Sequence, residues 1–77
     1  MTDIRFPPLS TDEPDKEGVV ATWFVLDGEA VQAGQLLAEV QMDKVSFEVE
    51  APSDGSVRLL VPEGAPVHQG DVIATVG

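Results

Sequence analysis

A chain of 77 residues is enough for one small domain. Its net charge is −10, from 14 acidic against 4 basic residues, whereas nucleic-acid binding requires positive charge to neutralise phosphates. There is no cysteine, so neither a disulfide nor a thiolate metal site supports the fold, and no other metal site is predicted. No apolar run could span a membrane, and no export signal is visible at the N-terminus. We therefore expect one cytoplasmic, monomeric domain over residues 1–77.

Short strands separated by turns account for the chain from end to end. Hydrophobic residues make up 43% of the sequence and aromatic residues only 5%, and the valine-rich share of them suits β-strands. Turn residues recur so densely that no helix of ordinary length fits, so the fold is predicted to be all-β. The predicted strands cover residues 3–6, 18–25, 35–42, 45–51, 56–61 and 72–76, with an exposed acidic loop over 10–17 and turns at 27–28, 52–55, 63–64 and 70–71.

The second half of the chain repeats the first. Residues 25–40 align with residues 61–76, and the alignment places Gly28 over Gly64 and Gly34 over Gly70. Shared glycines indicate shared backbone turns, so two copies of one turn-and-strand unit are predicted about a twofold axis. The first copy has one extra residue before position 25, which either a β-bulge or an earlier strand start would explain.

The apolar phase of the sequence changes at Asp43-Lys44. Apolar residues occupy even positions over 36–42 and odd positions over 45–51. A continuous strand cannot change phase, whereas a hairpin with a two-residue turn does so naturally. The predicted pairs are Met42 with Val45, Val40 with Phe47 and Ala38 with Val49, all on one buried face. The same register sets Glu39 opposite Glu48. The turn contains neither glycine nor asparagine, so a turn type other than the usual primed ones is predicted.

Lys44 is predicted to lie at the tip of this hairpin, in solvent. A catalytic lysine needs burial or a neighbouring cation, and Lys44 instead follows Asp43. Such a position offers an accessible primary amine on a rigid stalk, which another enzyme could acylate.

These segments together resemble the lipoyl domains of 2-oxo acid dehydrogenase acyltransferases, within the wider biotinyl/lipoyl-attachment family. The resemblance runs from Ile4 to Val76 and centres on residues 36–45. The flanking motifs that carry it are Trp23-Phe24-Val25-x-x-Gly28, Gly34, Glu50-Ala51-Pro52-x-x-Gly55 and Val61-Pro62-Glu63-Gly64. It implies a flattened β-barrel or sandwich of two four-stranded antiparallel sheets with pseudo-twofold symmetry, a modified lysine at a hairpin tip and both termini at the far end.

The resemblance also implies a function. Lipoate would be attached by an amide to Lys44, with Asp43 and Val45 as flanking recognition residues, and the domain would be a non-catalytic carrier of acyl groups and reducing equivalents. The parent chain would be a prokaryotic dihydrolipoamide acyltransferase of a pyruvate, branched-chain or other 2-oxo acid dehydrogenase complex, and this chain its N-terminal piece. The implied partners are a lipoate ligase or octanoyl/lipoyl transferase, a thiamine-dependent 2-oxo acid decarboxylase, the acyltransferase core and dihydrolipoamide dehydrogenase.

Two alternatives compete with the lipoyl interpretation. Biotin carboxyl carrier domains place methionine on both sides of the lysine, whereas Asp43 and Val45 stand here, which favours lipoate. An unmodified hairpin interaction module, the other alternative, has no need of a lysine at the tip. Lys44 beside Asp43 therefore favours a modified carrier.

The remaining polar residues are predicted to be solvated surface. His68 is the only histidine and builds neither a metal site nor a triad, while Asp27 and Glu63 lie in turns without the clustering of calcium loops. Lys16 belongs to the acidic loop rather than to a hairpin. We also hypothesise that the acids of this loop help the decarboxylase recognise the domain; they are Asp12, Glu13, Asp15 and Glu17.

Overall fold

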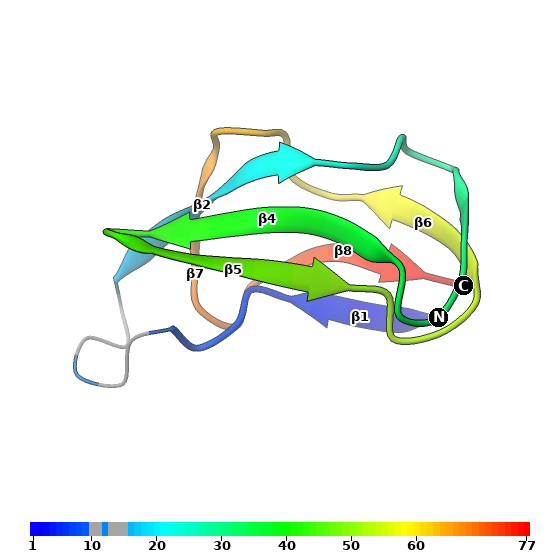
Figure 1. The fold of residues 1–77 in the computed structure, drawn as a ribbon, viewed down its shortest axis with the longest axis horizontal. Helices are drawn as coiled ribbons and strands as arrows, with labels where there is room; N and C mark the ends of the chain where they lie inside the picture. The colour runs from blue at the N-terminus through cyan, green and yellow to red at the C-terminus, as the bar shows by residue number, and fades with distance from the viewer. Residues whose placement is uncertain (10–11, 13–15) are drawn as a thin grey trace.

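The computed structural model describes residues 1–9, 12 and 16–77, which form eight β-strands and no helix. The strands are β1 (Thr2–Arg5), β2 (Glu17–Trp23), β3 (Ala30–Val31), β4 (Leu36–Met42), β5 (Val45–Glu50), β6 (Gly55–Leu59), β7 (Pro66–His68) and β8 (Val72–Val76). They form two antiparallel sheets, ordered β1-β8-β6-β3 and β5-β4-β2-β7 (Figure 1). The predicted all-β fold is confirmed.

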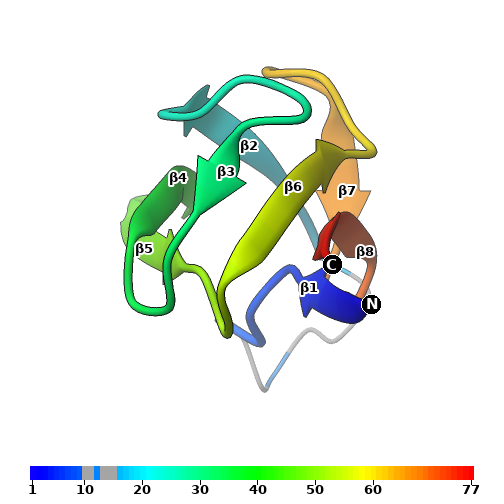
Figure 2. The ribbon, with the colours of Figure 1, turned by 90° about the vertical axis from the view of Figure 1, so that its right-hand side faces the viewer.

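The two sheets form a flattened sandwich. Figure 2 shows the molecule end-on, with β5, β4 and β2 on one side and β6, β8 and β1 on the other. Within the described residues no strand of one sheet pairs with a strand of the other, so the expected sandwich is correct and a closed barrel is not. All six predicted strands are present, with ends within two residues of the predicted ones. The sequence missed β3 and β7, which have only two and three residues, too few to show a period of two.

The internal twofold predicted from the repeat is present in the backbone. Exchanging β1 to β4 with β5 to β8 converts one sheet order into the other. The repeated glycines take nearly equal φ angles, 87° at Gly28 against 80° at Gly64 and 85° at Gly34 against 86° at Gly70. The left-handed region that these angles occupy favours glycine, so each repeated glycine marks a turn that both copies need.

The irregularity in the repeat is a β-bulge. The β2–β4 register shifts between Val20 and Thr22, so Ala21 is the extra residue on β2. The bulge lets the longer first copy keep the same pairing at both ends of β2, with Val19 opposite Gln41 and Trp23 opposite Ala38.

Two acidic side chains join the copies to each other. The backbone N–H of Trp23 donates to Glu63 Oε1 at 2.8 Å, and the backbone N–H of Leu59 donates to Asp27 Oδ1 at 2.9 Å. Trp23 and Leu59 are equivalent positions of the repeat, as are Asp27 and Glu63. Both acids are exposed and lie outside the strands, as predicted, and each also accepts a hydrogen bond from the last residue of a strand in the other copy.

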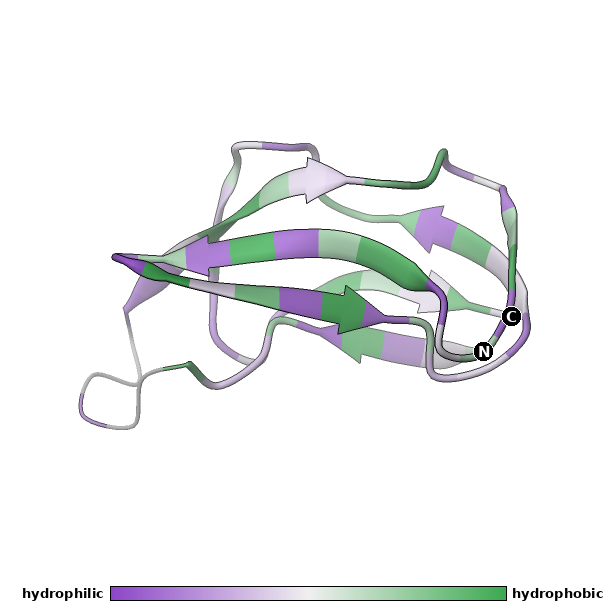
Figure 3. Ribbon diagram, viewed as in Figure 1, coloured by the Kyte–Doolittle hydropathy of each residue, from purple (hydrophilic) through white to green (hydrophobic). Residues whose placement is uncertain are grey.

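The core lies between the sheets and is almost entirely aliphatic. Apolar and polar residues alternate along the strands of Figure 3, as expected for sheets with one face buried. The largest side chains with less than 2% of their surface exposed are Phe6, Leu37, Ile73, Val20, Val40, Val57 and Val76. Trp23 is partly buried against this core and its Nε1 donates to the carbonyl oxygen of Val61, whereas Phe24 is 51% exposed.

Candidate functional site

The β4–β5 hairpin has the predicted register. Met42 pairs with Val45, Val40 with Phe47 and Ala38 with Val49, and the two-residue turn is Asp43-Lys44. β4 is an interior strand held by β2 and β5, so the hairpin is anchored along its length. Its tip lies at the opposite end of the molecule from the N- and C-termini (Figure 1). The fold therefore projects the turn away from the chain ends.

The turn has an unusual backbone angle at its first central residue. Asp43 has a φ of 54° and is the only non-glycine residue with positive φ in the described chain. Positive φ at the first central residue excludes the ordinary type I and type II turns, in which that residue has negative φ. Aspartate can take this φ angle because its short polar side chain tolerates the left-handed region better than most side chains do.

The two lysines of the chain lie at the same end of the fold in different environments. Lys44 is exposed, and within the described residues it has neither an ion pair nor a side-chain hydrogen bond. Lys16 precedes β2, and its Nζ forms an ion pair with Asp43 Oδ2; its side chain is 28% exposed. The β2–β4 register, with Val19 opposite Gln41, brings the start of β2 beside the tip and explains this contact. Lys16 thus lies in the loop before β2, as predicted, and contacts the hairpin tip from there.

The predicted burial of the hairpin's inner face holds for only part of it. Val40, Met42 and Val49 are buried, but Val45 and Phe47 are each 49% exposed. The register is correct, so these two side chains share the face of the buried ones. They are exposed because β5 is the edge strand of its sheet and the hairpin tip extends beyond the cover of the other sheet.

The outer face of the hairpin is acidic. Glu39 lies directly opposite Glu48, as predicted, and no basic side chain of the described chain pairs with either. Glu50 extends the same edge and is exposed. Like charges directly opposite each other in a sheet are mildly destabilising, so this face is not arranged for stability alone.

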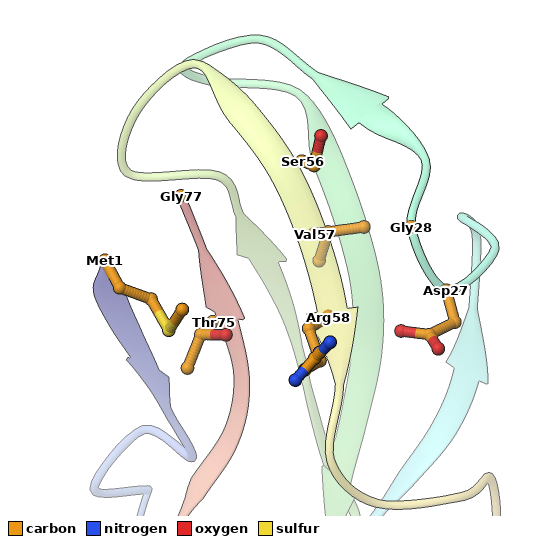
Figure 4. A pocket seen from close by; sticks show the side chains of 8 residues that line it. All are labelled: Met1, Asp27, Gly28, Ser56, Val57, Arg58, Thr75 and Gly77. Atoms are coloured by element: carbon orange, nitrogen blue, oxygen red, sulfur yellow. The ribbon is translucent and has the colours of Figure 1, made fainter.

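Other features of the described chain are weaker candidates for a functional site than the hairpin tip. A hollow of about 290 Å³ lies at the end with the termini, where Met1, Thr75, Arg58 and Asp27 line it across β8 and β6 (Figure 4). The described residues contain no group of side chains suited to a metal ion, and no helix with the length and apolar character needed to cross a membrane. His68 is exposed, with its Nδ1 3.8 Å from Asp71 Oδ2. Of the four acids in the predicted recognition loop, Asp12 and Glu17 are exposed, while Glu13 and Asp15 lie outside the described residues.

An exposed lysine at a hairpin tip of a duplicated β-sandwich is the arrangement that the sequence resemblance implied, and comparison with known proteins gives the family. The family described as "Biotin-requiring enzyme", the biotin/lipoyl family, matches residues 2–76. The chain belongs to this biotinyl/lipoyl-attachment family. The match covers all eight strands, so the whole sandwich is the family's domain.

Relatives of this biotinyl/lipoyl domain are acyltransferase components. It is 40% identical, over 96% of its length, to the dihydrolipoyllysine-residue acetyltransferase component of the pyruvate dehydrogenase complex of Zymomonas mobilis. It is 36% identical, over its full length, to the dihydrolipoyllysine-residue succinyltransferase component of the 2-oxoglutarate dehydrogenase complex of Staphylococcus saprophyticus. The chain spans only 17% and 18% of these two relatives.

A solved structure is similar over the whole domain. The lipoyl domain of the 2-oxoglutarate dehydrogenase complex from Azotobacter vinelandii superposes with a TM-score of 0.80 and 33% identity, covering 100% of this chain and 96% of that one. The exposed, unpaired amine of Lys44 suits a covalently attached group, because nothing in the described chain would have to move to admit one.

Proposed function

We propose that this biotinyl/lipoyl domain is a lipoyl carrier and that lipoate is joined by an amide bond to Nζ of Lys44. The observation that carries the proposal is the exposure of Lys44 at a two-residue hairpin tip, with the other nearby lysine held in an ion pair. When bound, lipoate supplies a cyclic disulfide that can accept an acyl group and two electrons. The protein's own residues make no covalent change in a substrate; they present the amine.

The surrounding residues determine how that amine is presented. The β4–β5 ladder fixes the tip, and the turn at Asp43 directs the chain so that Lys44 meets solvent. We propose that Asp43 and Val45, which flank the lysine, are read by the attaching enzyme, a lipoate ligase or an octanoyl/lipoyl transferase. Because β4 pairs with strands on both of its sides, the attaching enzyme meets a preformed hairpin and little ordering free energy is lost on binding.

The longer relatives suggest the wider role. We propose that the chain is one part of a dihydrolipoamide acyltransferase, and that it moves between a thiamine-dependent 2-oxo acid decarboxylase, the acyltransferase core and dihydrolipoamide dehydrogenase. Support comes from two named relatives, components of the pyruvate and 2-oxoglutarate complexes. The proposal is made for the class of 2-oxo acid dehydrogenase complexes, because components of two of them are similar to this chain at 40% and 36% identity.

A direct labelling experiment tests the lipoyl proposal. The protein is incubated with lipoate, ATP and a lipoate ligase, and the intact mass and a proteolytic map are measured. We expect one lipoyl group on Lys44 in the wild type and in Lys16→Arg, and none in Lys44→Arg. A lipoyl group on Lys16, or an unlabelled wild type, would contradict the proposal.

Biotin is the second candidate, because the family includes biotin-requiring enzymes. The residues beside the lysine argue against it, since neither Asp43 nor Val45 is methionine. We expect biotin protein ligase to leave the wild type unlabelled and to label Lys44 detectably in Asp43→Met/Val45→Met. Efficient labelling of the wild type would reverse the assignment.

A further inference from the structure

Two half-exposed apolar side chains lie next to the proposed attachment site. Val45 follows Lys44 directly and Phe47 comes two residues later on the same face of β5, and each is 49% exposed. We call these two side chains the apolar ledge. Isolated exposed apolar residues are common on proteins, but this pair is contiguous and begins at the residue after the lysine.

The internal twofold shows that the fold does not require an aromatic residue in the ledge. Phe47 pairs with Val40, and in the other sheet the equivalent of Val40, Val76, pairs with Thr2. β1 and β5 are both edge strands, and Thr2 is exposed as well as polar. The deeper equivalents, Val49 and Ile4, are both buried and apolar. Packing in the core therefore explains why the inner positions of the two strands are apolar. It does not explain the aromatic ring at Phe47.

We propose that the apolar ledge is a resting surface for the lipoyl arm carried by Lys44. The inference rests on the proposed function, since it needs that arm. The arm folds back from the tip along β5, and its methylene chain covers Val45 and Phe47 whenever no partner holds it.

The reach of the arm is sufficient. Phe47 lies three residues from Lys44, about 10 Å along an extended strand. The flexible four-carbon stem of lysine, extended through the amide by a second aliphatic chain, spans such a distance. Long side chains with apolar stems commonly lie along apolar surface in this way. Because the arm is tethered beside the ledge, its effective concentration there is on the order of millimolar, so a weak contact is enough to populate the docked position.

The charges around the ledge favour an uncharged occupant. Asp43 precedes it, and Glu48 and Glu50 lie on the same edge strand, with their side chains on the outer face of the hairpin. A second copy of this chain, with its own net charge of −10, would be repelled from this edge. The lipoyl arm is neutral once the lysine nitrogen is in an amide, so it gains the apolar contact without that repulsion.

Nuclear magnetic resonance of the lipoylated domain tests the ledge. The arm's methylene protons are expected to show nuclear Overhauser contacts to the Phe47 ring and upfield ring-current shifts relative to free lipoamide. Phe47→Thr, which copies the residue at the twofold-equivalent position and should fold normally, is expected to abolish both signals. Phe24→Thr removes an aromatic ring that is 51% exposed but follows the opposite end of β2, so it should leave them unchanged.

Each outcome of this experiment has one meaning. Intact mass first establishes that Lys44 carries the lipoyl group, so a missing group refutes the proposed function and not the ledge. If the group is present but its methylene shifts equal those of free lipoamide, or are the same in wild type and Phe47→Thr, the ledge proposal is wrong and the surface is open for a partner protein instead. Equal loss of signal in Phe24→Thr would also overturn it.

Discussion

Among the glycines of the chain, Gly18 is the one at which an added side chain would meet its neighbours at the shortest distance. A Cβ on Gly18 would lie 2.3 Å from Cζ of Phe6 and 2.8 Å from the backbone carbonyl oxygen of Gln41. Neither neighbour can move away easily, because Phe6 is 1% exposed in the core and Gln41 belongs to β4, an interior strand of its sheet. The Gly18→Ala substitution must therefore displace packed atoms.

We expect Gly18→Ala to lower the free energy of unfolding by about 2 kcal/mol, within the range of roughly 1–3 kcal/mol typical of overpacked cores. For a domain of this size, each kcal/mol lowers the melting temperature by about 4–8 °C, so the midpoint should fall by roughly 8–16 °C. Urea and thermal unfolding, followed by far-ultraviolet circular dichroism and by the fluorescence of the single tryptophan, Trp23, measure both quantities.

A double-mutant cycle identifies the cause. Phe6→Leu removes Cζ, the nearer obstacle, so the cost of Gly18→Ala should be smaller in that background but not zero, since the Gln41 oxygen remains. Gly64→Ala is the matched control: its Cβ would meet nothing within 4 Å, and its φ of +80° alone should cost about 1–2 kcal/mol in both backgrounds. If Gly18→Ala is neutral, or if Phe6→Leu leaves its cost unchanged, the steric explanation is wrong.

Three further predictions concern charged side chains. Lys16→Gln and Asp43→Asn, alone and combined, should show a coupling in unfolding free energy below about 1 kcal/mol, because the paired side chains are 28% and 61% exposed. The coupling should shrink in high salt. Additive effects of the two substitutions at low salt would contradict the ion pair. Glu48→Gln should raise the free energy of unfolding by roughly 0.2–1 kcal/mol, because it removes the charge opposite Glu39. Glu50→Gln should not, because Glu50 lies opposite Leu36. Urea unfolding of the two variants makes the comparison. Replacing Asp12, Glu13, Asp15 and Glu17 by their amides should slow reductive acylation by the cognate decarboxylase at low ionic strength only. If the variant is acylated as fast as the wild type at both low and high salt, the loop does not contribute to recognition.

The hairpin and the twofold could be predicted from the sequence because both depend on local periods. The phase change at Asp43-Lys44 fixed the register of the hairpin, and the repeated glycines located turns that both copies share. The strand period tells which face a side chain lies on, but not whether another layer covers it. Phe47 was therefore assigned to the correct face and to the wrong degree of burial.

The features that the sequence could not show depend on contacts between distant residues. Glu63 accepts the backbone N–H of Trp23, 40 positions away, and nothing local in the turn signals it. The ion pair of Lys16 with Asp43 likewise follows from the order of β2 and β4 in the sheet. The positive φ of Asp43 was missed because the prediction relied on glycine and asparagine, which are only the commonest residues in such turns.

The internal twofold also means that the chain is almost a closed ring. By the repeat, Gly77 is equivalent to Gln41 and Met1 to Ser46, so only the counterparts of residues 42–45 are missing between the chain ends. Four added residues could join the ends into a second hairpin, and the chain could be opened at Asp43-Lys44 instead. The architecture therefore offers two interchangeable positions for an acceptor lysine. The backbone of the sandwich therefore does not by itself distinguish the pole that carries Lys44 from the opposite pole, where residues 1 and 77 lie.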